Sequence, residues 1–185
     1  MKTKQREELR LELQQHTHFG SFDLTSGGTS DYYIDVRPIL LHSSSFRAVS
    51  LELLQRLHSN IDVVAGIGIS GSLLVASILA HSIKDLKGLI VRKEKRTHGL
   101  TRTIEGDSLV QNCNVALVDD ILNRGSSLSF AARALKDLRN CTVTQWIVFV
   151  DRSEAPIEGA PEISAVLTSA EILNGVEFGR TLKKV

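Results

Sequence analysis

The feature that most constrains the fold is a series of short, largely apolar runs separated by stretches that favour helix. The runs are Ile61–Ala65, Leu89–Val91, Val115–Val118, Thr142–Val150 and Ala165–Leu167. Helical stretches over Leu73–His81 and Ser127–Arg139 lie between them. Continuous hydrophobicity is typical of strands that are buried on both faces, and strands that alternate with helices predict a parallel sheet. The sequence therefore predicts an α/β fold in which helices flank a parallel sheet.

The N-terminal part has a different pattern. Its expected elements are a helix over Met1–Gln15, a loop or hairpin over Phe19–Ser30, with a short strand near Gly20–Leu24, a strand over Asp31–Val36 and a helix from Ser43–Ser45 to Leu57. The first helix follows from its Glu, Lys, Gln, Arg and Leu content. Three glycines and many hydroxyl groups predict the hairpin, and Pro38 is expected to end the strand.

Bulk composition limits the kinds of partner. A chain of 185 residues with 42% hydrophobic content suits one domain over residues 1–185. Its net charge of +1 offers no general attraction to nucleic acid or membranes. The polar N-terminus does not resemble a signal peptide, and no apolar run approaches the roughly 20 residues that span a bilayer. We expect a cytoplasmic protein with no nucleic-acid or membrane partner, and with Cys113 and Cys141 as free thiols rather than zinc ligands.

Candidate site residues follow the predicted strands, because ligands of a parallel sheet bind beyond its carboxyl ends. This rule selects Gly66–Ser72, Arg92–Gly99, Asp119–Ser127 and Asp151–Glu154. In the third segment, backbone N–H groups of a Gly-Ser-Ser turn before a helix form a cradle for phosphate. The two acids ahead of it suit sugar hydroxyls or hydrated Mg²⁺. A ligand with a phosphate and a diol explains both halves. The alternative is a strand-turn-helix whose Asp and Ser are only caps.

These motifs resemble a known family. Two acids after an apolar strand, then a loop ending in Gly-Ser-Ser, resemble the ribose-phosphate motif of type I phosphoribosyltransferases. Arg92-Lys-Glu, His98-Gly and Arg102-Thr-Ile-Glu-Gly106 resemble the catalytic loop of orotate phosphoribosyltransferases in particular. The segment Phe19–Arg37 resembles their hood, and Asp151-Arg152 their orotate-gripping pair. The resemblance, from about Phe19 to Leu173, implies a type I phosphoribosyltransferase fold, in which residues 1–40 and the C-terminal segment contribute a helix and a small hood.

The resemblance also implies roles for individual residues. Catalytic roles fall on Asp119, Asp120, Arg96 and Lys95. Arg96 stands where the family has its catalytic Lys, and Lys95 is adjacent. Phosphoribosyl diphosphate would contact Thr25, Ser70, Arg92, Lys93, Arg96, His98, Asp119, Asp120, Ile121, Leu122, Asn123, Arg124, Gly125, Ser126 and Ser127. Orotate would contact Tyr32, Tyr33, Asn123 and Arg152. Mg²⁺ would enter bound to the diphosphate. No direct protein ligand is expected, and Asp119 and Asp120 would be the protein side chains beside the metal.

The implied reaction joins orotate and phosphoribosyl diphosphate into orotidine 5′-monophosphate and diphosphate, a step of de novo pyrimidine synthesis. In this family the basic loop reaches a neighbouring subunit's site, which implies a homodimer. Two alternatives remain open. Gly28 and Asp31 depart from the family pattern and leave room for another base. Arg96, Thr97 and Arg124 also depart from it, and they motivate a non-catalytic regulator that binds phosphoribosyl diphosphate. A plain α/β protein without this ligand is the third reading.

Overall fold

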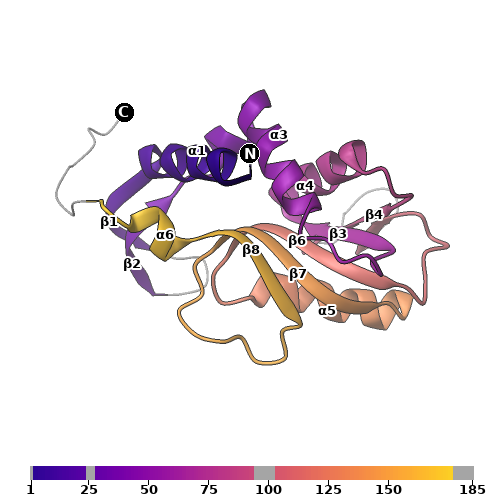
Figure 1. The fold of residues 1–185 in the computed structure, drawn as a ribbon. Helices are drawn as coiled ribbons and strands as arrows, with labels where there is room; N and C mark the ends of the chain where they lie inside the picture. Colours follow the sequence, from indigo (N-terminus) through magenta and orange to yellow (C-terminus); the bar gives the residue numbers. More distant parts are fainter. Residues whose placement is uncertain (1, 24–27, 94–102, 177–185) are drawn as a thin grey trace.

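The structure is a computed structural model that describes residues 2–23, 28–93 and 103–176 (Figure 1). The helices of the described residues are α1 (Lys2–Gln15), α2 (Arg37–Leu40), α3 (Ser43–Leu54), α4 (Gly68–His81), α5 (Ser126–Arg139) and α6 (Ser169–Leu173). The strands are β1 (Thr17–Asp23), β2 (Thr29–Ile34), β3 (Val63–Ile67), β4 (Lys87–Val91), β5 (Ile104–Gly106), β6 (Asn114–Leu122), β7 (Thr142–Asp151) and β8 (Glu162–Thr168).

Six of these strands form the central sheet, in the order β5-β4-β3-β6-β7-β8. The strands β4, β3, β6, β7 and β8 are parallel, and only the short β5 runs antiparallel, beside β4. The predicted α/β fold with a parallel sheet is therefore confirmed. Three elements were not predicted from the sequence, namely β5, α2 and α6, which have three, four and five residues.

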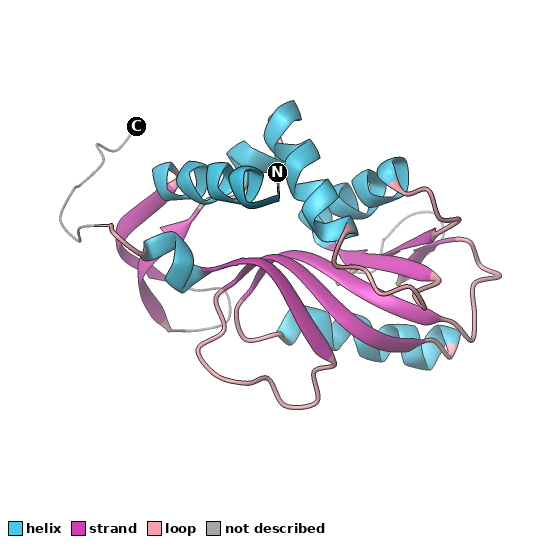
Figure 2. Ribbon diagram, viewed as in Figure 1, coloured by secondary structure: helices cyan, strands magenta, loops and turns pink. Residues whose placement is uncertain are grey.

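Helices cover both faces of the sheet, as Figure 2 shows, with α1, α3 and α4 above it and α5 below. Successive strand residues point to opposite faces. Val64, Ala116 and Val118 pack in the core beneath α3 and α4. Ala65 and Leu117 pack in the second core, which includes Leu128, Ala131 and Leu135 of α5. This double burial is why the strands read as continuous rather than alternating apolar runs.

The α4 helix lies unusually close to β3, because two glycines face each other. A Cβ on Gly66 would overlap the backbone carbonyl of Gly71, and a Cβ on Gly71 would lie only 3.1 Å from the backbone of Gly66. The helix begins at Gly68 rather than at Leu73, so the segment Gly66–Ser72 consists of the end of β3 and the first residues of α4. Its first turn therefore lies directly at the carboxyl end of β3.

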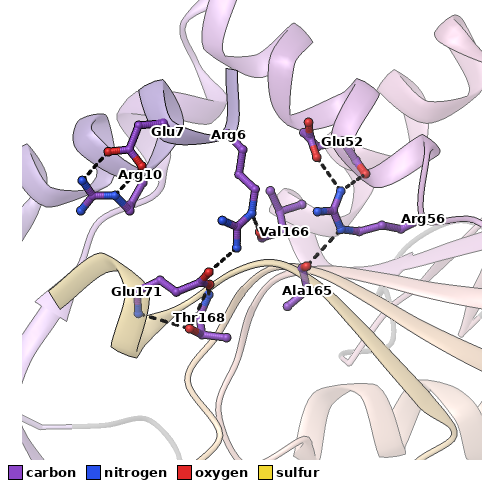
Figure 3. Close-up of polar contacts among 9 residues, drawn as sticks. All are labelled: Arg6, Glu7, Arg10, Glu52, Arg56, Ala165, Val166, Thr168 and Glu171. Carbon is purple, nitrogen blue, oxygen red and sulfur yellow. Dashed lines mark hydrogen bonds and ion pairs between the residues drawn. The ribbon is translucent and has the colours of Figure 1, made fainter. Parts of the chain in front are cut away.

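The N-terminal helix α1 packs against β8 and α6 near the C-terminal end of the described residues. Its Leu9 and Leu13 are buried, as their shared helical face predicts. Arg6 Nε donates a hydrogen bond of 2.8 Å to the Val166 carbonyl and pairs with Glu171 of α6 (Figure 3). In the same view Arg56 Nε donates to the Ala165 carbonyl at 3.0 Å. These contacts cover β8, an edge strand whose open carbonyl groups would otherwise be exposed.

Several element boundaries differ from the sequence predictions. The hairpin is confirmed as antiparallel β1 and β2, but β2 ends at Ile34, and Pro38 lies within α2 rather than at a strand end. His42 is the N-cap of α3, so Ser43–Ser45 form its first turn, and the helix ends at Leu54.

None of the helices in the described ranges is long and apolar enough to cross a membrane.

Candidate functional site

Two pockets open where β3, β4 and β6 end, at the carboxyl edge of the sheet. The smaller has a volume of about 290 Å³ and lies toward β7 and the β1–β2 hairpin. The larger, of about 820 Å³, lies toward α4 and β4. Asp119, Ile121 and Ser127 line both pockets. The end of β6 therefore stands between two adjoining chambers, which suits a ligand with two separate polar groups.

The wall of the smaller pocket includes the turn between β6 and α5. Gly125 has a φ of 71°, and a Cβ there would lie 3.0 Å from Ile157 and 3.1 Å from Trp146, so this position requires glycine. The turn leads into Ser126, the first residue of α5. Within the described residues no side chain caps this helix. Its first N–H groups therefore remain available to an anion, as the predicted phosphate cradle requires.

Arg152 forms the opposite wall of this pocket. Its backbone N–H donates to the Leu122 carbonyl at 2.7 Å, which holds it beside the end of β6. Only 9% of the residue is exposed. Nη2 donates to Ser30 Oγ at 3.0 Å, and the guanidinium carbon lies 4.4 Å from the centre of the Tyr32 ring. Nε is buried without a hydrogen-bond partner in the described residues. A buried, unpaired donor of this kind favours binding of an acceptor such as a carboxylate.

The hairpin contributes more to this site than the sequence revealed. Tyr33 and Asp23 line the smaller pocket. Among the described residues Tyr32 is not part of its wall, because the Tyr32 ring packs against the hydrophobic core and against the Arg152 guanidinium. Ser30 and Asp23 were not predicted as site residues. No local motif marks either residue, because their relevance depends on contact with a side chain about 120 positions away, as the Ser30–Arg152 bond illustrates.

The larger pocket collects the predicted diphosphate ligands that the structure describes. Its polar lining includes Ser70, Ser72, Arg92, Lys93, Asp119, Asp120 and Ser127. Lys93 Nζ donates to Ser127 Oγ at 2.7 Å and so links the end of β4 to the first turn of α5. Arg92 pairs with Glu105 of β5 at 3.7 Å. This ion pair holds the Arg92 guanidinium at the pocket wall. It was not expected from the sequence, because the strand β5 that carries Glu105 was not predicted.

The two adjacent acids differ in environment, because β6 continues through both of them. Asp119 is 9% exposed, and its Oδ1 accepts a hydrogen bond of 2.9 Å from the Asp120 N–H. Burial raises the pKa of Asp119 well above its usual value, and the neighbouring Asp120 carboxylate adds to the rise, whereas Lys93 opposes it. Asp120 is half-buried and lines the larger pocket. A carboxylate with solvent access, as Asp120 has, suits a hydrated Mg²⁺. The described residues contain no cluster of three or more His, Cys, Asp or Glu side chains around a common point.

Asp119→Asn is expected to stabilise the free protein at neutral and alkaline pH. A raised pKa means that the fold favours the protonated Asp119 side chain. The stabilisation that this acid provides is therefore complete below its unfolded-state pKa of about 3.8, and it is lost as the pH rises through its folded-state pKa. The amide resembles the protonated acid and does not ionise. We expect the melting temperature at pH 8 to rise by roughly 2–4 °C, as for a gain of about 1 kcal/mol in a chain of this size. Calorimetry at pH 4 and pH 8 measures it; an equal or lower melting temperature at pH 8 would contradict it.

The remaining predicted residues fall into two groups. Thr25, Lys95, Arg96 and His98 lie outside the described residues. Asn123 and Arg124, which were predicted to contact substrate, line the smaller pocket. The Arg124 side chain extends toward the hairpin, because its Nη2 lies 3.5 Å from the point where a Cβ of Gly28 would stand. The Arg124 guanidinium thus comes close to the hairpin at Gly28, where no side chain occupies the space.

Comparison with known proteins adds independent information. No protein-family model matches the chain. An orotate phosphoribosyltransferase of Staphylothermus marinus is 36% identical over 168 residues, which cover 88% of this chain and 79% of that relative. Orotate phosphoribosyltransferase of Mycobacterium tuberculosis H37Rv is similar in structure, with a TM-score of 0.73 and 27% identity over 93% of this chain and 99% of that one. The Aeropyrum pernix enzyme of the same name gives a TM-score of 0.71 and 27% identity, covering 88% and 93% of the two chains.

Proposed function

The chain belongs to the orotate phosphoribosyltransferase family, and we propose that it transfers a phosphoribosyl group from phosphoribosyl diphosphate to orotate. The products are orotidine 5′-monophosphate and diphosphate. The observation that carries the choice of base is Arg152, a buried residue that lines the smaller pocket and whose Nε has no hydrogen-bond partner among the described residues. Orotate carries a carboxylate, and arginine binds carboxylates through two parallel hydrogen bonds.

The two pockets divide the substrates between them. The 5′-phosphate binds at the turn from Asn123 to Ser127, where the first N–H groups of α5 are available. Asp119 and Asp120 hold the ribose hydroxyl groups from the end of β6. The diphosphate lies in the larger pocket against Lys93 and Ser70, and orotate lies in the smaller one against Arg152. The ribose then lies between the departing diphosphate and the incoming orotate, next to Asp119, which lines both pockets.

In this reaction the protein positions the two substrates and forms no covalent bond with either of them. The bond from the ribose C1′ to the diphosphate breaks as a ring nitrogen of orotate bonds to C1′, through a state with oxocarbenium character. Lys93 offsets negative charge on the departing diphosphate, and the fixed dipoles of the α5 turn hold the phosphate end still. Mg²⁺, carried by the diphosphate beside Asp119 and Asp120, would supply further charge neutralisation.

The wider setting is also proposed. We expect a homodimer with shared sites in the cytoplasm, acting in de novo pyrimidine synthesis, as the sequence resemblance implies. The described part of the chain includes Lys93 and Arg92 but not the rest of the basic segment. A partner's basic segment would complete the diphosphate side of each larger pocket. Light scattering after gel filtration measures the oligomeric state, and a monomer at assay concentration would contradict this part of the proposal.

A turnover assay tests the function directly. Incubated with orotate, phosphoribosyl diphosphate and Mg²⁺, the protein is expected to consume orotate, as followed by its ultraviolet absorbance. Matched reactions contain adenine instead of orotate, or ribose 5-phosphate instead of the donor, and neither should turn over. Absence of orotate loss at high protein concentration would contradict the proposal. If calorimetry then showed binding of phosphoribosyl diphosphate, the non-catalytic regulator would replace it.

A further inference from the structure

Two Asn-Cys dipeptides stand side by side at the edge of the sheet opposite the pockets. Asn112-Cys113 comes directly before β6, and Asn140-Cys141 comes directly before β7. The parallel register pairs Asn114 with Thr142, so the two cysteines are neighbours across the strands. The Thr142 N–H donates to the Cys113 carbonyl at 2.9 Å. The sheet itself therefore brings together two thiols that are 28 positions apart in the sequence.

The surroundings of the two thiols hold them in contact. Both asparagines have a φ of 50°, a left-handed conformation that asparagine tolerates better than most residues. Asn140 Nδ2 donates to Asn112 Oδ1 at 2.6 Å, which ties one dipeptide to the other. The Cys113 and Cys141 sulfur atoms are 2.8 Å apart, against about 2.0 Å in a disulfide bond. Closing the remaining distance requires only a small movement of two side chains.

Access to the pair comes from one side. Cys141 is 2% exposed, whereas Cys113 is half-buried. Cys113 also lines a pocket of about 200 Å³ whose other walls include Asp62, Asp85, Lys87 and Gln111. A small oxidant can therefore reach Cys113 first, and Cys141 lies behind it in position to complete the reaction.

We propose that Cys113 and Cys141 are a disulfide-forming pair that closes by exchange with a low-molecular-weight disulfide. The Cys113 thiolate attacks one sulfur of the oxidant, forms a mixed disulfide and releases one small thiol. The Cys141 thiolate then attacks the Cys113 sulfur and releases the second small thiol. Two protein thiols and one small disulfide thus become one protein disulfide and two small thiols, and the two thiol protons pass to the leaving groups.

The chemistry of Cys113 sets the pace of this exchange. Burial, and then its hydrogen bond with Cys141, raise the pKa of the Cys113 thiol to about 12. Because only the thiolate attacks, the reaction is slow at neutral pH and its rate should rise by roughly tenfold per pH unit below that value. A reducing compartment keeps the pair open, and the crosslink forms only where the balance of small thiols and disulfides favours it.

The crosslink encloses β6, the phosphate turn and α5 in one covalent loop. Such a loop restricts the unfolded chain and so stabilises the fold. For the full chain treated with oxidised glutathione at pH 8.5, we expect an intact mass lower by two hydrogen atoms and no reaction with iodoacetamide under denaturing conditions. Tryptic peptides 103–124 and 140–152 should appear joined. The melting temperature should rise by about 5–10 °C and return to its starting value with dithiothreitol.

Two variants separate this crosslink from general oxidation. Cys113→Ser and Cys141→Ser should each retain one alkylatable thiol or a single glutathione adduct, with no thermal gain on oxidation. Stable glutathione adducts on the parent chain, a covalent dimer, or two free thiols after prolonged oxidation would each overturn the proposal. The decisive reading is made on the parent chain, so a variant that folds poorly does not affect it.

Discussion

Asp120→Asn is expected to weaken binding of phosphoribosyl diphosphate with Mg²⁺ by roughly 10- to 150-fold while changing the melting temperature by less than about 2 °C. The reason is that Asp120 is half-buried and lines the larger pocket, whereas within the fold its side chain accepts a 2.9 Å hydrogen bond from the neighbouring Ile121 N–H. A hydrogen bond to a charged group contributes about 1.5–3 kcal/mol, and the amide loses that charge. Titration calorimetry measures the affinity.

The matched control is Asp137→Asn, which makes the same substitution at an exposed position of α5, away from both pockets. It should leave the affinity unchanged. The comparison with Asp119→Asn is equally informative, because that variant should lose affinity and gain stability. Equal affinity in Asp120→Asn and the parent would remove the proposed contact between this carboxylate and the ligand.

Arg152→Gln is expected to raise the KM for orotate by about 100-fold and to leave the affinity for phosphoribosyl diphosphate within about twofold. Removing one partner of a buried charge pair typically costs about 2–5 kcal/mol, and Arg152 lies at the wall away from the diphosphate side. Arg152→Lys keeps the charge but loses the planar fork, so it should recover only part of the affinity. Initial rates at varied orotate measure KM.

Arg133→Gln is the control, since Arg133 is an exposed arginine of α5 outside the site. Circular dichroism establishes whether each variant is folded, because Arg152 also bonds Ser30 and stacks on Tyr32. If orotate KM were unchanged in a folded Arg152→Gln protein, another group would have to hold the carboxylate. A parallel loss of affinity for phosphoribosyl diphosphate would instead indicate general damage to the pocket.

The orotate side of the site shows how far sequence reasoning extended. The segment Asp151–Glu154 was selected by its place after a strand, because the carboxyl ends of parallel strands share one edge, and the family resemblance then assigned Arg152 to orotate. Ser30, which holds its guanidinium, was not predicted, because that contact joins the hairpin to a distant strand. Tyr32 and Tyr33 were assigned together to the base pocket. Alternation along β2 separates them, so that Tyr33 lines the pocket and Tyr32 supports Arg152 from the core.

What the sequence determined by itself was the parallel α/β architecture and the glycine turn that leads into α5 at Gly125–Ser127. Both depend on local properties, namely the continuous hydrophobicity of each short run and the conformational freedom of glycine. Only the tertiary structure decided that Asp119 is buried and Asp120 accessible, and that Cys113 touches Cys141. Two adjacent acids look alike in a sequence, and two distant thiols look unrelated. Burial and contact arise when strands pack beside one another, so they belong to the sheet rather than to any one segment.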